Sequence, residues 1–167
     1  LIVHITEVSQ WAPLVSSLPG RALKLAERCW PGPLTIILPK SPLVPYETSG
    51  GLDTVAVRCP SHPAARAVIN AAGVPLAAPS ANISGRPSPT TFAHTYEDLS
   101  GLVDAVLDGG DCQVGVESTV VSLCGDVPRL LRPGGVTEGQ LRSVLGELEV
   151  DPAGIGELKP GEPARSP

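Results

Sequence analysis

The most informative stretch of the chain is Ala77-Ala-Pro-Ser-Ala-Asn-Ile-Ser-Gly-Arg-Pro-Ser88, a short apolar run that breaks into a turn rich in hydroxyl and amide groups. A hydrophobic core does not need so many polar groups in one turn, whereas phosphates and ribose are bound by hydroxyls, side-chain amides and backbone N–H groups. Turn formation alone is the alternative explanation for Ser80 and Asn82. The number of polar groups favours a loop that binds a small molecule or a nucleotide.

Strands and helices interleave on both sides of this turn. Apolar runs predict strands at residues 1–5, 35–38, 54–58, 74–78, 105–108, 117–123 and 129–131, and a loop over 41–53. Helices are predicted at 19–30, 60–73, 90–99 and 137–145, with Ser61 and Thr137 as N-caps and Gly73 as a C-terminal stop. Several strands follow one another directly, which is typical of a mixed sheet. The sequence therefore predicts an α/β fold with a mixed sheet and flanking helices.

Composition limits the domain organisation and the classes of function. The 167 residues, 42% of them hydrophobic, fit one domain with a core of ordinary size. From Glu149 onward the apolar period is lost, so we predict a domain over 1–147 and a linker or flap over 148–167. The net charge of −5 argues weakly against a general nucleic-acid binder. No apolar run approaches the about 20 residues that a membrane-crossing helix needs, so no membrane partner is expected.

The chain has four cysteines with no Cys-x-x-Cys spacing: Cys29, Cys59, Cys112 and Cys124. This pattern favours free thiols in a reducing compartment over a zinc site or a redox pair.

Several charged or hydroxyl side chains stand at predicted strand ends. Arg58 and Arg132 each end a strand, where an arginine is either a plain surface residue or a guanidinium aimed at a carboxylate or phosphate. Ser118 stands near the start of a strand, and His4 faces the opposite side from its apolar neighbours. A structural role is the alternative for His4. No catalytic triad, paired catalytic carboxylates, His-Glu-x-x-His motif or Walker loop is present. Two arginines and several hydroxyls at strand ends suit an anionic ligand.

Six short motifs, taken together and in order, resemble the YrdC-like family of threonylcarbamoyl-AMP synthases. They are Leu1-Ile-Val-His, Pro31-Gly-Pro-Leu-Thr, Val57-Arg-Cys-Pro, Ala78-Pro-Ser-Ala-Asn-Ile-Ser-Gly, Gly115-Val-Glu-Ser-Thr-Val and Leu131-Arg-Pro-Gly. The resemblance covers residues 1 to about 145. It implies a twisted sheet with a large concave cleft, in a cytoplasmic enzyme that converts L-threonine, bicarbonate and ATP into threonylcarbamoyl-AMP and pyrophosphate. The product would feed the machinery that modifies tRNA to threonylcarbamoyladenosine.

The resemblance also implies a role for each matching residue. The L-threonine contacts would be His4, Arg58, Ala78 through its backbone, and Ser118, with Arg58 pairing the carboxylate. The ATP side would be lined by Thr54, Ser80, Asn82, Ser88 and Arg132. No covalent nucleophile is implied, and Mg²⁺ is expected on the phosphates.

The sequence departs from the family pattern at its start. A Pro-Thr-Asp-Thr-x-Tyr-Gly strand and a Lys-x-Arg loop usually precede the first motif, so we expect an N-terminally incomplete domain. The tail resembles the start of the linker to an extra C-terminal domain, which we expect to be missing. Three alternatives stay open: a double-stranded RNA-binding module, a carbamoyl-transfer domain without threonine chemistry, and a degenerate fragment without activity.

Overall fold

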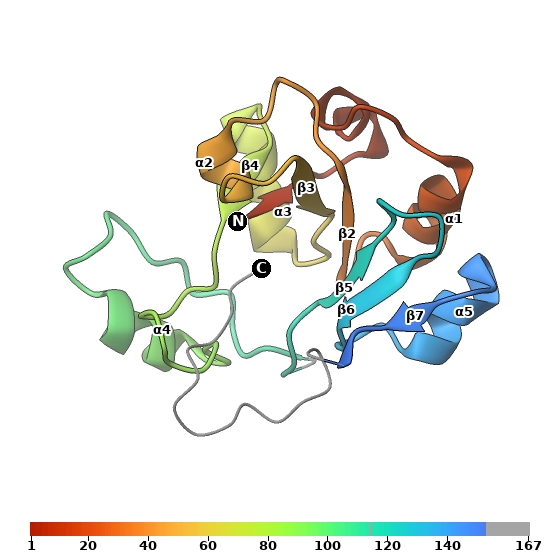
Figure 1. Cartoon of the computed structure of the whole chain (residues 1–167). Coiled ribbons are helices and arrows are strands. Elements are labelled where there is room, and N and C mark those ends of the chain that lie inside the picture. The colour runs from red at the N-terminus through yellow and green to blue at the C-terminus, as the bar shows by residue number, and fades with distance from the viewer. Residues whose placement is uncertain (114, 153–167) are drawn as a thin grey trace. The chain divides into compact units, whose positions relative to one another are not determined.

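The computed structural model of the protein describes residues 1–113 and 115–152, which form two compact units (Figure 1). The first unit contains residues 1–78 together with the described residues from 117 onward. The second contains the intervening residues 79–113, 115 and 116. All strands of the sheet belong to the first unit.

The described residues of the first unit build one seven-stranded sheet in the order β4-β1-β3-β2-β5-β6-β7. Its strands are β1 (Ile2–His4), β2 (Leu34–Pro39), β3 (Thr54–Arg58), β4 (Leu76–Ala78), β5 (Thr119–Ser122), β6 (Arg129–Arg132) and β7 (Glu149–Val150). The pairs β1/β3, β2/β5 and β6/β7 are parallel, whereas β1/β4, β2/β3 and β5/β6 are antiparallel. The prediction of a mixed α/β sheet is therefore confirmed, including the β5–β6 hairpin.

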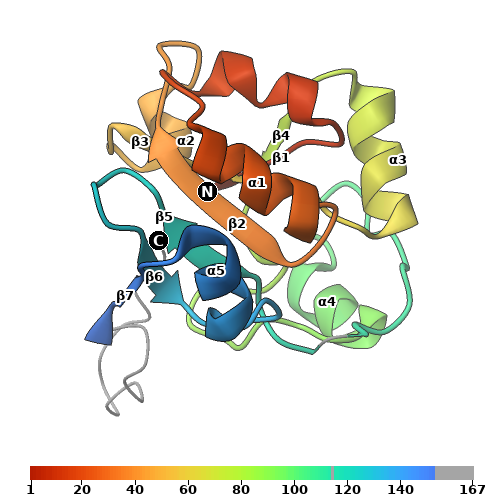
Figure 2. The same ribbon diagram turned by 90° about the vertical axis from the view of Figure 1, so that its right-hand side faces the viewer.

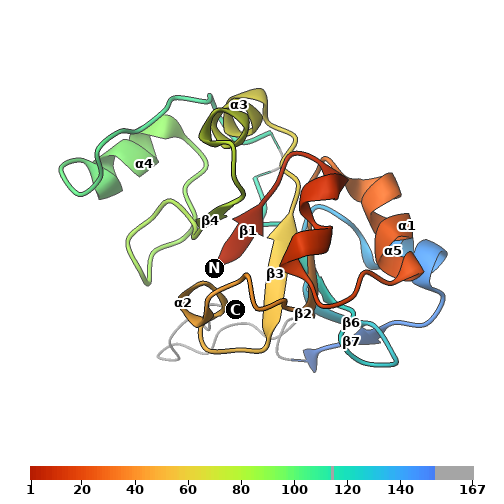
Figure 3. The same cartoon turned by 90° about the horizontal axis from the view of Figure 1, so that it is seen from above.

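One face of the sheet carries the hydrophobic core. The register aligns one apolar residue from each of five neighbouring strands, namely Val3, Val57, Ile36, Val121 and Leu130, and all are buried. Helices α1 (Gly20–Cys29) and α5 (Glu138–Leu145) contact each other and cover this face (Figures 2 and 3). They add buried Leu25 and Leu141 to the core. Because side chains alternate along a strand, the polar side chains of these strands gather on the opposite face.

Two short 3₁₀ helices and helix α3 complete the connections around β1. The 3₁₀ helices η1 (Val8–Gln10) and η2 (Ala12–Leu14) follow the first strand. Helix α3 (Pro63–Ala72) begins after His62, whose ring nitrogen accepts a hydrogen bond from the Ala64 amide at 3.1 Å. The N-cap is thus His62 and not Ser61 as predicted, because Pro63 supplies the first helical residue. The predicted stop at Gly73 is confirmed by its left-handed φ of 70°.

The structure differs from the prediction in three other segments. The predicted loop 41–53 contains a short helix, α2 (Tyr46–Ser49), which ends at the left-handed Gly50. The predicted strand at 105–108 is wrong, because the second unit has no strand among its described residues that could pair with it. Strand β7 extends the sheet into the segment predicted to leave the domain, and Leu148 is buried beside it. The division into a domain and a linker or flap otherwise stays a prediction, since residues 153–167 lie outside the described residues.

The second unit is built around helix α4 (Phe92–Leu99). Thr91 caps its first turn by accepting a hydrogen bond from the His94 amide. The rings of Phe92 and Tyr96 pack with centroids 5.6 Å apart. Across both units, no helix among the described residues is long and apolar enough to cross a bilayer.

Candidate functional site

The face of the sheet opposite α1 and α5 carries a row of side chains that the strand register aligns, and all but one of them are polar. In the register of neighbouring strands, His4 lies opposite Arg58, and Arg58 lies opposite Thr35. Thr35 in turn lies opposite Val120, and Val120 lies opposite Arg132. The row therefore crosses five adjacent strands and includes three residues predicted to bind ligand. We call it the arginine row.

A bulge in β6 puts Arg132 in this row. The β5–β6 register shifts between Val120, which pairs with Arg132, and Val121, which pairs with Leu130. Leu130 faces the core and Arg132 lies two residues on, so an unbroken strand would turn both side chains to the same face. The extra residue, Leu131, reverses the alternation and brings Arg132 to the polar face.

Ser118 lies at the centre of a hydrogen-bond cluster beside the row. Its hydroxyl is 2.9 Å from the Thr35 hydroxyl and accepts a bond from Nη2 of Arg132 at 3.0 Å. Nε of Arg132 also donates to the Ser118 carbonyl at 3.0 Å, and its Nη1 pairs with the Glu117 carboxylate at 2.8 Å. Ser118 and Thr35 are buried, and the Arg132 side chain is 28% exposed. The structure thus brings Ser118 and Arg132 into direct contact, and their roles in ligand binding stay a prediction.

The backbone of Gly134 packs directly on this cluster. A β-carbon there would lie 2.7 Å from the Ser118 carbonyl carbon and 2.5 Å from the Thr119 nitrogen. Only glycine allows this approach, which fixes the main chain at Ser118 against the turn after β6.

Arg58 has a different environment from Arg132. Its Nε donates to the Gly32 carbonyl at 3.2 Å, and no carboxylate among the described residues forms an ion pair with it. Burial, and then the positive charge of Arg132, lower the pKa of Arg58. An anion bound at Arg58 would offset both the burial of the guanidinium charge and its repulsion by Arg132.

His4 is the neighbour of Arg58 in the row. Burial, and then the charge of Arg58, lower the pKa of His4 from its ordinary value of 6.5, although backbone hydrogen bonds oppose the shift. The imidazole is therefore neutral at pH 7. Its Nδ1 is buried and has no hydrogen-bond partner among the described residues. A neutral ring can hydrogen-bond a ligand without adding charge.

Thr54 and Ala78 share the face of the arginine row. Thr54 is four residues before Arg58 on β3, and Ala78 pairs with Ile2, two residues before His4 on β1. Both are half-buried. The first unit thus places all six of its predicted site residues on or beside one sheet face.

The other three predicted residues belong to the second unit, and their approach to the arginine row stays a prediction. Ser80 is exposed, whereas Asn82 and Ser88 are half-buried. The Asn82 amide nitrogen donates to the Ile83 and Arg86 carbonyls at 2.9 and 3.0 Å, which closes the loop on itself. The Asn82 amide oxygen is buried and has no partner among the described residues. The turn-forming explanation therefore holds for the nitrogen of Asn82, while no partner in the described part of the chain accounts for its buried oxygen.

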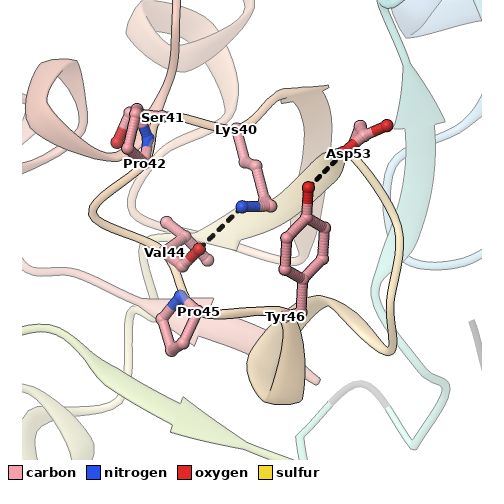
Figure 4. Close-up of a pocket in the computed structure, with 7 residues that line it drawn as sticks. All are labelled: Lys40, Ser41, Pro42, Val44, Pro45, Tyr46 and Asp53. Carbon is pink, nitrogen blue, oxygen red and sulfur yellow. Dashed lines mark hydrogen bonds between the residues drawn. The ribbon is translucent and has the colours of Figure 1, made fainter.

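A pocket of about 380 Å³ lies at one end of β2 and β3 (Figure 4). None of the predicted residues lines it, although its lining residue Asp53 directly precedes Thr54. Its polar groups already bond to one another. Nζ of Lys40 donates to the Val44 carbonyl at 2.9 Å and lies 4.0 Å from the Tyr46 ring centre. The Tyr46 hydroxyl donates to Asp53 at 2.8 Å, and this bond raises the pKa of Tyr46. The pocket is lined by Lys40, Ser41, Pro42, Val44, Pro45, Tyr46 and Asp53.

Sequence reasoning missed three residues that organise this site: Thr35, Glu117 and Gly134. Thr35 and Glu117 stood inside quoted motifs, but their side-chain partners depend on which strands are neighbours. Gly134 follows Arg132 in a Pro-Gly-Gly turn that sequence alone explains as a flexible exit. A polar residue inside the apolar run Leu34–Leu38 was the available signal for Thr35.

The fold and the arginine row together describe an α/β domain with two arginines on one sheet face, an arrangement that suits an anionic ligand. The family model described as telomere recombination, covering Sua5, YciO and YrdC, matches residues 1–134. The chain is 49% identical over 157 residues to the threonylcarbamoyl-AMP synthase of Pyrococcus abyssi, covering 94% of this chain and 46% of that protein. It is 51% identical over 153 residues to that of Bacillus subtilis, covering 90% and 44%. The chain belongs to the Sua5/YciO/YrdC family.

A solved structure extends this likeness to the fold. The crystal structure of P. abyssi Sua5 complexed with L-threonine matches with a TM-score of 0.90 and 48% identity, covering 95% of this chain and 47% of that chain. The chain thus spans about half the length of the curated relatives it matches.

Proposed function

We propose that this chain is the catalytic domain of a threonylcarbamoyl-AMP synthase, which condenses L-threonine, bicarbonate and ATP into threonylcarbamoyl-adenylate and pyrophosphate. The observation that carries the proposal is Arg58, a half-buried guanidinium with no ion-pair partner among the described residues and a second arginine in its row. Such a group suits the carboxylate of an amino acid. The relatives named threonylcarbamoyl-AMP synthase, one of them solved with L-threonine, support this choice of ligand.

Each residue of the first unit has a proposed task. Arg58 pairs the L-threonine carboxylate, and neutral His4 and the Ser118 hydroxyl hydrogen-bond its polar groups. The Ala78 backbone borders the same substrate. Thr54 and Arg132 face ATP, with Arg132 held in place by Glu117.

The second unit supplies the rest of the proposed ATP side through Ser80, Asn82 and Ser88. Mg²⁺ would arrive with the phosphates of ATP as part of the substrate. Among the described residues, no group of three or more His, Cys, Asp or Glu side chains could hold a metal by itself.

The proposed chemistry needs positioning and positive charge rather than a nucleophilic side chain. The L-threonine amine forms a carbamate, either by attacking CO₂ with loss of a proton or by reacting with bicarbonate with loss of water. A carbamate oxygen then attacks the α-phosphorus of ATP, and the bond to pyrophosphate breaks. Fixed guanidinium groups stabilise the carboxylate and the charge on the phosphate oxygens. The adenylate would pass to the tRNA-modification machinery in the cytoplasm.

The test is pyrophosphate release from ATP by the full-length protein, with and without L-threonine and bicarbonate. Release should require both. Arg58→Ala should weaken L-threonine binding by about 2–5 kcal/mol, because a buried carboxylate would lose its partner. Exposed Arg28→Ala, at the end of α1, is the matched control and should behave like the wild type.

Other outcomes would favour the alternatives. Use of carbamoyl phosphate with indifference to L-threonine would indicate a carbamoyl-transfer domain. Salt-dependent binding of double-stranded RNA without pyrophosphate release would indicate an RNA-binding module. A folded protein with neither behaviour would indicate a degenerate fragment.

A further inference from the structure

Thr35 is a fully buried polar residue in the middle of the arginine row. Its side chain has no exposed surface, and its hydroxyl lies 2.9 Å from that of Ser118. Valine has nearly the same shape and would fill this position without a polar group to satisfy. Packing therefore does not explain why a hydroxyl group stands at this position.

The number of protons and lone pairs around Ser118 supplies that explanation. A hydroxyl has one proton and two lone pairs, and Arg132 already donates to one lone pair of Ser118. If Ser118 donated to Thr35, the Thr35 proton would be buried with no acceptor among the described residues. If Thr35 donates instead, both lone pairs of Ser118 are used and its own proton is left over.

We infer that Thr35 is a positioning residue that makes the Ser118 hydroxyl a hydrogen-bond donor toward the substrate. Donation from Thr35 and Arg132 orients the Ser118 oxygen from two sides, and the close approach of Gly134 fixes its main chain. The remaining proton then needs an acceptor that the ligand brings. This inference rests on the proposed function, because it takes an oxygen of L-threonine as that acceptor.

A site built this way discriminates by the chemistry of the ligand. A substrate oxygen with a free lone pair is accepted, whereas a donor group facing Ser118 would meet a second donor. Thr35 touches no substrate in this arrangement and acts only through Ser118.

The experiment compares three variants of the full-length protein by calorimetric L-threonine binding, pyrophosphate release and urea unfolding. Thr35→Val removes the hydroxyl and keeps the shape, whereas Thr35→Ser keeps the hydroxyl. Ile36→Val is the matched control, because it trims the next residue of β2 on the core face and lowers stability alone.

We expect Thr35→Val to weaken L-threonine binding and raise its KM by about 3- to 10-fold, the worth of one hydrogen bond. Its KM for ATP should stay unchanged. Thr35→Ser should return L-threonine binding to within about two-fold of the wild type, since it retains the donor. Ile36→Val should bind L-threonine normally despite its lower stability.

Two results would overturn the inference while leaving the proposed function intact: normal L-threonine binding by Thr35→Val, or equal weakening by Thr35→Val and Ile36→Val. A wild-type protein that binds no L-threonine would overturn the proposed function and this inference together.

Discussion

Replacing Gly134 with alanine should displace the Ser118 segment, because a β-carbon at this position has no room. The new atom would lie 2.5 Å from the Thr119 nitrogen and 2.7 Å from the Ser118 carbonyl carbon, and would also press on the Glu117 carbonyl oxygen. All three are backbone atoms, so no side chain can rotate away. Ordinary contact begins near 3.5 Å, which requires a shift of about 1 Å.

The magnitude follows from that shift. Overpacking of this kind costs about 1–3 kcal/mol of folding free energy. A displacement of about 1 Å at a group that positions substrate can lower the reaction rate about 100-fold. Gly134→Ala should therefore lower both the free energy of unfolding and the rate of L-threonine-dependent pyrophosphate release.

The assay measures urea unfolding and pyrophosphate release for Gly134→Ala beside Gly139→Ala. Gly139 lies in the first turn of α5, where the nearest atom to an added β-carbon is 4.0 Å away. Alanine should stabilise that helix by up to about 1 kcal/mol, since glycine loses more conformational freedom on folding. The two substitutions should therefore change the free energy of unfolding in opposite directions. A Gly134→Ala protein with wild-type stability and rate would refute the argument that this contact fixes Ser118.

Two further predictions concern stability. The Arg21 guanidinium donates to three backbone carbonyls of the β5–β6 turn at 2.6–2.9 Å. Arg21→Ala should therefore lower the free energy of unfolding, measured in urea, by about 1.5–3 kcal/mol. An equal loss of stability in exposed Arg28→Ala would contradict this. His4 has a pKa below its ordinary 6.5, so the unfolded state binds more protons than the folded state below pH 6.5 and stability should fall as the pH drops from there toward the folded pKa. His4→Asn should flatten that slope, and an unchanged pH profile would contradict the buried neutral imidazole.

The fold was largely predictable because its strands are short apolar runs separated by proline and glycine. The bounds of β3 and the N-cap at Thr137 were predicted to the residue. The failures have physical causes. The apolar run at 105–107 has no neighbouring strand in the described part of the second unit. The helix start at 60–63 depends on which of Ser61 and His62 can reach an amide.

The site was predictable only in part, because it depends on strand neighbours. Arg58 and Ser118 could be selected from their motifs, but nothing in the sequence shows that β2 lies between β3 and β5 and brings Thr35 to both. The orientation of Arg132 is harder still. Regular alternation from the core residue Leu130 would point the Arg132 side chain into the core as well. Only the bulge at Leu131 turns Arg132 to the polar face.

The two arginines of the row differ in a way that suits a two-substrate site. Arg132 already has a carboxylate and two Ser118 oxygens as partners, so its charge is partly neutralised before any ligand binds. Among the described residues, Arg58 has one backbone carbonyl, that of Gly32, as its hydrogen-bond partner. Burial together with the charge of Arg132 disfavours the protonated form of Arg58. Binding a carboxylate at Arg58 removes an existing cost, whereas a phosphate at Arg132 would compete with Glu117. This asymmetry favours the amino acid at Arg58 and the nucleotide at Arg132, because a polyanion can better offset the loss of an ion pair that is partly exposed to solvent.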